Sequence, residues 1–448
     1  MQEGVTAGGH VLLGWNVVWV AGILFVATYI VIMSEKINRA IAALLGGSLM
    51  IILGVLNQEA AVRGVDFNVL GLLTGMMVLV AITRKTGVFQ YVAIWSAKKV
   101  NARPLGILLM LSVVTAVFSA LLDNVTTVLL IVPVTLLITE ELEIDPYPIL
   151  AAEIFSSNIG GTATLIGDPP NIMIGSAANL SFNDFLVNVA PITPLIFVLT
   201  IVPIAFLWRK RLVTTEALRE RVLSFREHEA ITDPKLLRKC LFVLGLVFVG
   251  FLAHGALHLE PATIAMFGAA LLLLLANMGE DAEEQSKAVH EAFAEAEWVT
   301  LFFFVGLFIL VKGVEEAGLL DMLARSVLQL TRGSLEVTSY AVLWVSAIAS
   351  GIVDNIPFVA AMIPVIHQMG PALGGPEHLE IVWWSLSLGA CLGGNGTLIG
   401  ASANVVVAGF AERAEEPIRF IPFLKVSVPA MLLSIVISNG YLYLRYLH

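Results

Sequence analysis

Apolar segments of about 17 to 25 residues recur along this chain, and each is long enough to cross a lipid bilayer as a helix. Of the 448 residues, 58% are hydrophobic and only 13% are charged, whereas a water-soluble protein of this length needs a more polar surface. The pattern predicts an all-α polytopic membrane protein. We expect uninterrupted spans at residues 11–33, 37–56, 67–84, 186–208, 240–257, 261–277, 297–312 and 422–444.

Two further apolar segments, residues 147–180 and 379–411, contain glycines that interrupt a helix. The first includes SSNIGGTATLIGDPPNIMIG at residues 156–175. Irregular backbone is tolerated in a bilayer only where protein or a watery cavity satisfies its polar groups. The two segments therefore predict broken helices that border a transport site. Pro169 and Pro170 fit the first turn of the restarting helix, where a missing amide hydrogen costs nothing.

Two more apolar segments carry an Asp-Asn pair near their midpoints, Asp123-Asn124 in the first and Asp354-Asn355 in the second. Ionisable side chains in a membrane are expensive and mark functional positions. We expect both segments to form re-entrant hairpins with the Asp-Asn pair at the tip. The hairpins span residues 104–139 and 335–370, and an amphipathic interfacial helix is expected before each, at residues 87–100 and 315–331.

The second half of the chain repeats the first. SALLDNVTTVLLIVPV (119–134) aligns with SGIVDNIPFVAAMIPV (350–365), and GGTATLIGDPPN (160–171) aligns with GGNGTLIGASAN (393–404). We expect two repeats, residues 1–208 and 240–448, joined by a polar linker at 209–239. We expect five spans and one hairpin in each repeat, or seven spans if both arms of the hairpin cross the membrane. Because both numbers are odd, the second repeat must be inverted relative to the first, as in many secondary transporters.

The distribution of Lys and Arg predicts the orientation of the chain. If the basic linker is cytoplasmic, only Arg63, Lys312, Arg325, Arg332 and Arg445 of the 25 Lys and Arg residues face outside. This is the bias of the positive-inside rule. Both termini are then expected outside, and the N-terminus lacks the basic region of a cleaved signal peptide. We expect a multi-pass protein of the plasma (inner) membrane.

The motifs DNVTTVLLIVPV, SNIGGTATLIGDPPN and GGNGTLIGASAN resemble those of a known transporter group. The group contains arsenite permeases, NhaD-type sodium/proton antiporters and melanosomal P proteins, and it belongs to the ion transporter superfamily. The resemblance covers nearly the whole chain. It implies inverted repeats, re-entrant hairpins, a site at the membrane midplane and transport driven by an ion gradient. It does not fix the substrate.

Polar residues at the hairpin tips and the helix breaks are the candidate substrate- or ion-binding residues. Asn, Thr and Ser offer both donors and acceptors to a ligand. The alternative is structural: Asp at a hairpin tip can cap the returning helix, and the others can satisfy unwound backbone. The candidates are Asp123, Asn124, Thr127, Ser157, Asn158, Thr162, Thr164 and Asn171, and Asp354, Asn355, Asn395, Thr397 and Asn404 in the second repeat.

Two carboxyls occur in the first repeat alone, because Asp168 aligns with Ala401 and Glu153 with Leu386. Intramembrane carboxyls are typical proton carriers in transporters. We therefore expect proton coupling through Asp168 or Glu153. The alternatives are that Asp168 caps the helix that begins at Pro169, and that Glu153 is the partner of a polar neighbour.

The leading functional hypothesis is proton-coupled efflux of arsenite or antimonite, because arsenite at neutral pH is an uncharged trihydroxide that suits amide and hydroxyl groups. A sodium/proton antiporter is the alternative, with Asp123, Asn124 and Ser157 contributing to an oxygen cage. A sodium-coupled anion carrier is disfavoured because no Arg or Lys lies near the breaks in the sequence.

No enzymatic motif, phosphate loop or metal-ligand cluster is evident, so we expect no enzyme activity, cofactor or bound metal. The expected partners are the lipid bilayer, a small inorganic substrate and a coupling proton or sodium ion, with no nucleic acid. The sequence leaves open a separate ATPase subunit and a homodimer.

Overall fold

The computed structural model describes residues 14–34 and 36–448. Residues 11–13 of the first expected span, and the N-terminus whose side of the membrane was predicted, lie outside the described residues. The described part of the chain is helical and contains no strand. Within residues 14–34 and 36–448, seven helices are long and apolar enough to cross a membrane, or eight if one bent pair is a single span. The prediction of an all-α polytopic membrane protein is confirmed.

Among the described residues, eleven α-helices precede the linker. They are α1 (Val17–Met33), α2 (Arg39–Ile52), α3 (Gln58–Gly64), α4 (Phe67–Arg84), α5 (Val88–Lys99), α6 (Pro104–Leu121), α7 (Asn124–Glu141), α8 (Tyr147–Thr162), α9 (Pro169–Ala178), α10 (Phe182–Asn188) and α11 (Thr193–Trp208).

The linker contributes α12 (Glu216–Leu223). The remaining helices are α13 (Pro234–Leu257), α14 (Pro261–Ala276), α15 (Ala282–Ala294), α16 (Trp298–Glu316), α17 (Leu319–Leu330), α18 (Leu335–Ile352), α19 (Asn355–Met369), α20 (Glu380–Gly393), α21 (Ser402–Arg413) and α22 (Phe420–Leu442). The six helices from α4 to α9 correspond in order to the six helices from α16 to α21, so that α4 matches α16 and α9 matches α21.

Two predicted boundaries need correction. The span expected at 186–208 is bent by 58° between α10 and α11, because Pro191 and Pro194 lack the amide hydrogens that would continue a helix across the break. The predicted linker extended to residue 239, but α13 begins at Pro234. Asp233 caps it by accepting hydrogen bonds from the amides of Lys235 and Leu236, which fixes the helix start inside the polar stretch.

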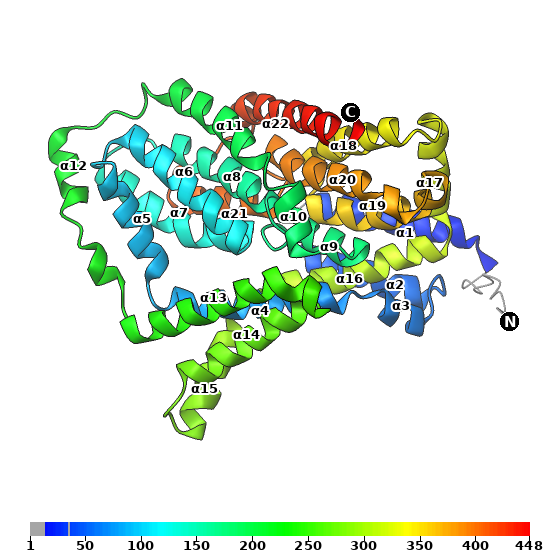
Figure 1. Ribbon diagram of the computed structural model, residues 1–448, viewed down its shortest axis with the longest axis horizontal. Coiled ribbons are helices and arrows are strands. Elements are labelled where there is room, and N and C mark those ends of the chain that lie inside the picture. Colours follow the sequence, from blue (N-terminus) through cyan, green and yellow to red (C-terminus); the bar gives the residue numbers. More distant parts are fainter. Residues whose placement is uncertain (1–13, 35) are drawn as a thin grey trace.

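Helices from the two halves of the chain pack closely against each other, α2 against α16 and α4 against α14 (Figure 1). Glycines allow this approach. A Cβ on Gly75 would lie 2.6 Å from the carbonyl carbon of Ala265, and one on Gly306 would lie 2.5 Å from that of Ala43. Small residues at such crossings let membrane helices associate closely. These helices, with α13, α15 and the short α3, form one layer, and α5–α11 and α18–α22 form a second (Figure 1).

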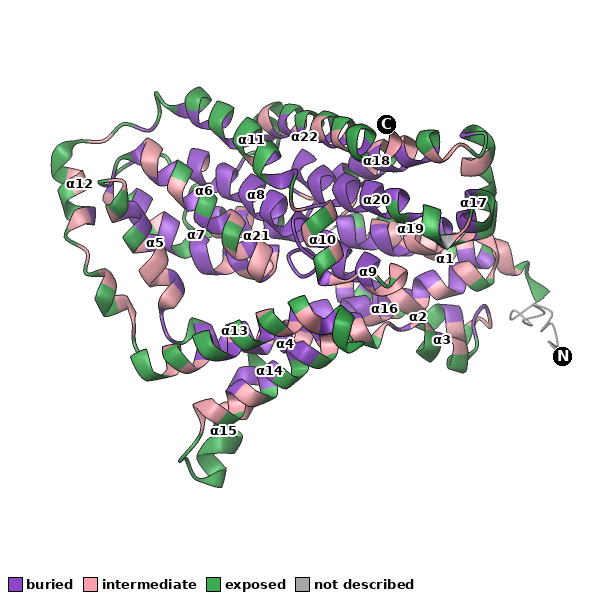
Figure 2. Ribbon diagram, viewed as in Figure 1, coloured by how far each residue is buried: buried purple, intermediate pink, exposed green. Residues whose placement is uncertain are grey.

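Helices α4 and α16, which have matching places in the order of helices, start at opposite ends of the molecule. Arg84 at the end of α4 forms an ion pair with Glu295, just before α16. The linker lies at this same end, where the Thr232 amide donates to the Thr86 carbonyl at 3.1 Å. We call this end of the molecule the linker side. The C-terminus and α3 lie at the other end, the opposite side (Figure 1). Burial is deepest in α8 and α20, between these two ends (Figure 2).

Candidate functional site

The two helix breaks meet the two hairpin tips inside the protein. Residues 163–168 separate α8 from α9, and residues 397–401 lie before α21. The backbone N–H of Asn124 at one tip donates to the Gly167 carbonyl at 3.0 Å. The backbone N–H of Asn355 at the other tip donates to the Gly400 carbonyl at 3.3 Å. Each broken helix therefore supplies a backbone acceptor to the tip of its own half.

The unwound backbone is tied by an asparagine in each half. The side-chain amide of Asn171 donates to the carbonyls of Gly161, Thr162 and Thr164 at 3.4, 3.1 and 3.0 Å. The amide of Asn404 donates to Gly394 and Thr397, both at 2.8 Å. Buried carbonyls need such partners because no water is available in a bilayer.

Asn158 joins the two halves. Its side-chain nitrogen donates to the Oδ1 atoms of Asn395 at 2.9 Å and Asn404 at 2.8 Å. Its own Oδ1 accepts from the side chain of Asn124 at 3.3 Å. All four residues are buried, so one amide network connects the first hairpin tip and both breaks.

Asp168 occupies the N-cap position of α9, but its side chain makes no capping hydrogen bond. It is fully buried. Both carboxyl oxygens accept from the Asn355 side chain, at 3.4 and 3.3 Å. The capping alternative for Asp168 is therefore not realised, and its carboxyl instead contacts the hairpin tip of the other half.

Glu153 lies apart from Asp168. Its Oε1 accepts a hydrogen bond from Thr135 on α7 at 2.6 Å, while Oε2 has no partner among the described residues. The side chain is fully buried. It therefore bonds a polar neighbour, as the structural alternative expected, and its second oxygen remains available.

The two hairpin aspartates both cap the returning helix. Asp123 accepts from the Thr126 amide at 2.8 Å, and Asp354 accepts from the Ile356 amide at 3.1 Å through Oδ1. The second oxygen of Asp354 is also engaged, because it accepts from Ser402 at 2.8 Å and pairs with Arg39 at 3.3 Å.

The remaining candidates divide into bonded and unbonded groups. The hydroxyls of Ser157, Thr162 and Thr164 donate to the carbonyls of nearby backbone, which is the structural role considered for them. In the described part of the chain, several buried polar atoms of the candidates have no partner: Asn124 Oδ1, Thr127 Oγ1, Asn395 Nδ2 and Thr397 Oγ1. These atoms remain free to contact a ligand.

A cavity of about 740 Å³ opens between the two layers near the linker side, and Asp354, Ser402 and Arg39 line it. A smaller one of about 270 Å³ lies on the opposite side and is lined by Asn68, Ile172 and His254, among others. The two cavities use equivalent helices, since the first is bounded by α16 and α21 and the second by α4 and α9. The larger cavity reaches the second hairpin tip, because Asp354 lines it.

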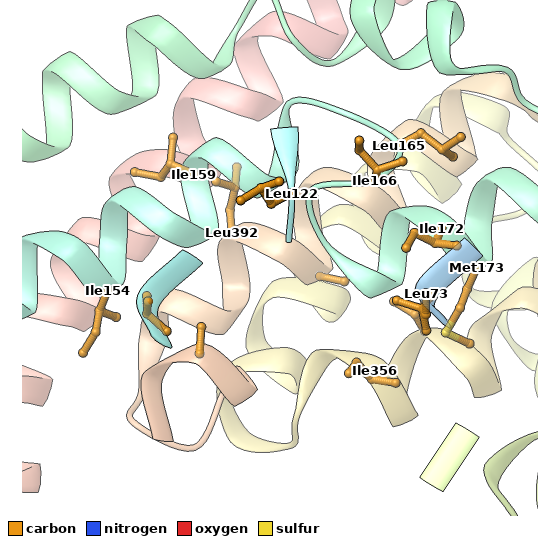
Figure 3. Close-up of a cluster of buried hydrophobic side chains, with 14 of the residues drawn as sticks. Leu73, Leu122, Ile154, Ile159, Leu165, Ile166, Ile172, Met173, Ile356 and Leu392 are labelled. Carbon is orange, nitrogen blue, oxygen red and sulfur yellow. The ribbon is translucent and has the colours of Figure 1, made fainter. Parts of the chain in front are cut away.

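Apolar side chains from both halves surround the breaks. Figure 3 shows Leu122 beside the first hairpin tip, Ile356 beside the second, and Leu392 on α20 near the break in its own half. All three are buried. This packing excludes water from around the amide network and strengthens its hydrogen bonds.

Three polar residues at the site were missed by the sequence interpretation. Ser387 donates to Asn171 Oδ1 at 2.7 Å, Ser402 contacts Asp354, and Arg39 bonds both Asp354 and Ser402. The α20 serine could have been suspected from its place on a helix that carries a break. Arg39 carried no such signal, because 315 residues separate it from Asp354.

Comparisons with known proteins show the family and the fold of the chain. Residues 29–389 match the model of a family described as CitMHS, citrate transporter. An uncharacterised transporter of Mycobacterium tuberculosis is 43% identical over 95% of this chain and 98% of its own length. The human P protein is 34% identical over 95% of this chain and 59% of its own length. The crystal structure of the YdaH transporter of Alcanivorax borkumensis superposes with a TM-score of 0.58 at 13% identity, covering 96% of this chain and 98% of that one.

Proposed function

We propose that Asp168 couples substrate movement to a proton. The premise is that the chain belongs to the citrate transporter family and is a secondary transporter of the ion transporter superfamily. The observation that carries this proposal is the contact between Asp168 and Asn355, which joins the first break to the second hairpin. A change in the protonation of Asp168 would alter a contact between the halves that must move during transport.

The chemistry around Asp168 suits both protonation states. The Asn355 amide donates to a carboxylate, and an amide oxygen accepts from a protonated carboxyl. No Lys or Arg among the described residues forms an ion pair with Asp168 within 4.0 Å. A buried carboxylate without a cation is costly, so a proton is a suitable countercharge.

The proposed substrate is arsenite or antimonite, exported in exchange for protons. The polar atoms without partners at the site belong to Asn and Thr side chains. Such groups match the hydroxyls of an uncharged trihydroxide better than they match a strongly charged ion.

A second candidate is an anion carrier, which the sequence interpretation disfavoured for lack of a nearby cation. Arg39 lies at the second hairpin tip and lines the larger cavity, and the family model is described as a citrate transporter. These two observations restore the anion carrier as a candidate. Sodium/proton antiport is the third candidate, with Asp123 and the unpartnered Asn124 Oδ1 as oxygen ligands.

The proposed membrane arrangement follows the charge bias of the sequence. Residues 1–208 and 240–448 are taken as inverted repeats in a plasma membrane, with the linker side cytoplasmic and the termini outside. The linker-side location of Lys85 and Arg84 supports this orientation through the positive-inside rule. The larger cavity then faces the cytoplasm, where an exporter loads its substrate.

Everted membrane vesicles test the proposal directly. Arsenite, sodium and citrate are supplied outside, and uptake is followed after a proton gradient is imposed, acid inside. The expected result is accumulation of arsenite that collapses with a protonophore and is absent in Asp168→Asn vesicles. Gradient-dependent movement of citrate or sodium without arsenite would contradict the arsenite proposal and select the alternative.

A further inference from the structure

His254, near the end of α13, joins the two layers of helices on the opposite side. Its Nε2 atom accepts a hydrogen bond from the backbone N–H of Phe182, the first residue of α10, at 2.9 Å. Its Nδ1 atom lies 3.0 Å from the Leu259 carbonyl oxygen. The Phe182 ring stacks on Phe251 of α13, with centroids 5.8 Å apart. Because α10 and α13 belong to different layers (Figure 1), the buried imidazole ties one layer to the other.

The two backbone partners of His254 fix the tautomer of its ring. A backbone N–H can only donate and a carbonyl oxygen can only accept. Nε2 must therefore be unprotonated toward Phe182, and Nδ1 must carry the hydrogen toward Leu259. A second proton can bind only at Nε2, where it would place one donor against another. The hydrogen bond between the layers would break, and the buried N–H of Phe182 would lose its acceptor.

The smaller cavity has three titratable residues in its wall, His254, His258 and Glu260. His258 is the last, exposed residue at the end of α13. The Glu260 carboxylate accepts a hydrogen bond from the Asn68 side chain at 2.9 Å. Of these three residues, His254 is the buried one that bonds across the layers.

The helices packed against α13 are α4, α10 and α14. On α10, Asp184 accepts from the backbone and the hydroxyl of Ser181, both at 2.7 Å. Asp66 caps the start of α4, and α14 itself carries no charged residue. These carboxylates have partners of their own. The other titratable groups of α13 and α4 lie toward the linker side, in the first two turns of α13 and at the end of α4: Lys235, Arg238, Lys239, Cys240 and Arg84.

Two further hydrogen bonds join the layers on this side. The Asn183 side chain on α10 donates to the Leu252 carbonyl of α13 at 2.8 Å, and the Asn68 side chain on α4 donates to Ser176 of α9 at 3.4 Å. Amides and hydroxyls keep the same protonation state between about pH 5 and pH 8, whereas histidine changes its charge in that range. Of the three bonds, the one to His254 is therefore the one that responds to pH.

We propose that His254 is a proton-sensitive latch, meaning a contact whose loss lets the two layers separate at the smaller cavity. The neutral ring holds α10 against α13, and protonation at Nε2 releases it. In the proposed orientation this side faces outside, from where protons enter in exchange for an exported substrate. The inference rests on the proposed function for that orientation alone, and it adds a proton-dependent step apart from Asp168.

The test measures access to the smaller cavity in the purified full-length protein in detergent. The reporter is Ile172→Cys in a Cys240→Ala background, because Ile172 is buried and lines this cavity. Its rate of labelling by a maleimide is divided by the rate for Glu59→Cys, an exposed position in the same background. From about pH 8 to about pH 5.5 this ratio should rise about fivefold when residue 254 is histidine.

Three variants carry the same reporter, so the thiol's own response to pH is common to all. His254→Gln should keep a low ratio at both pH values, because an amide oxygen can accept from Phe182 and takes up no proton. His254→Phe should show a high ratio at both, because it offers no acceptor. His258→Asn is the matched control; asparagine tolerates the positive φ of 52° at this residue. It should keep the fivefold rise.

A ratio that does not rise when residue 254 is histidine would overturn the proposal, and so would an equal rise in His254→Gln. If His254→Gln cannot be purified, His254→Phe decides: a low ratio, or one that still rises in acid, contradicts the latch. The readout uses no transported solute and no proton gradient. Failure of proton coupling at Asp168 and failure of the latch at His254 are therefore separately visible.

Discussion

The two helix breaks use the same backbone scheme but different chemistry. Ser119 donates to the Ser157 carbonyl at 2.5 Å, and its equivalent Ser350 donates to the Ala390 carbonyl at 2.6 Å. Glycine and asparagine recur at matching places in both breaks. In contrast, Asp168 is matched by Ala401. The repeated residues build the unwound backbone, while the unmatched residues give each break its own charge.

Symmetric substitutions of the repeated glycines should have the largest effect. A Cβ on Gly160 would lie 2.2 Å from the Ala116 carbonyl oxygen, and one on Gly393 would lie 2.5 Å from that of Ala347. Backbone cannot move aside as a flexible side chain can. Gly160→Ala and Gly393→Ala should each cost about 3 kcal/mol or more, seen as loss of monodisperse protein in size-exclusion chromatography.

Gly409→Ala is the matched control, because no atom lies within 4 Å of its added Cβ. It should behave as wild type. A Gly160→Ala protein with wild-type yield and melting temperature would show that α8 does not pack closely against Ala116 of α6.

Substitution of either of the two asparagines, Asn171 and Asn404, should have the next largest effect, and the two effects should be similar. Asn171→Ala leaves three carbonyls without their side-chain donor, and Asn404→Ala leaves two. Each unsatisfied group costs about 1–3 kcal/mol. Both variants should lower the melting temperature and reduce transport at least tenfold.

Asn171→Asp tests the cause, because it keeps the shape of the side chain and removes the donating amide. It should fail as Asn171→Ala does. If Asn171→Asp instead transported at the wild-type rate, the carbonyl-tying role of this amide would be wrong.

The two sides of the molecule should differ in labelling. Cysteines are placed at Ser224 in the linker and at Glu59 on α3, in a Cys240→Ala background; the remaining Cys391 is fully buried. Both target positions are exposed. An impermeant thiol reagent should label the residue 59 cysteine in intact cells and the residue 224 cysteine in everted vesicles. The reverse pattern would invert the proposed orientation.

The smallest effect is expected at the surface pair of Lys85 and Glu291, whose nitrogen and oxygen lie 3.0 Å apart. The hydrogen bond from Lys85 lowers the pKa of the Glu291 carboxyl. Its contribution is present above the usual carboxyl pKa and is lost as the pH falls through the lowered value. Exposed pairs contribute little, so Lys85→Ala should leave the melting temperature at pH 7 unchanged, and a clear drop would contradict this.

Local sequence signals predicted the parts of the site that short motifs specify. Pro169 begins α9 as its motif indicated, and the Asp-Asn pairs lie at helix–helix turns. Contacts between distant segments could not be predicted. The bond from Asn158 to Asn395 joins residues 237 positions apart, and Arg39 reaches Asp354 only because α2 packs against α16 of the other half. A single sequence carries no record of such pairings.

The central claim is that Asp168, the carboxyl with no match in the second half, couples transport to protons. Accumulation driven by a proton gradient distinguishes this coupling role from a role in folding or in substrate binding. Asp168→Asn and Glu153→Gln are compared in everted vesicles for uphill accumulation under an imposed proton gradient and for downhill exchange without one. We predict that Asp168→Asn folds and retains downhill exchange but loses accumulation entirely, while Glu153→Gln retains both. Wild-type accumulation by Asp168→Asn would contradict the account and move the coupling to another carboxyl.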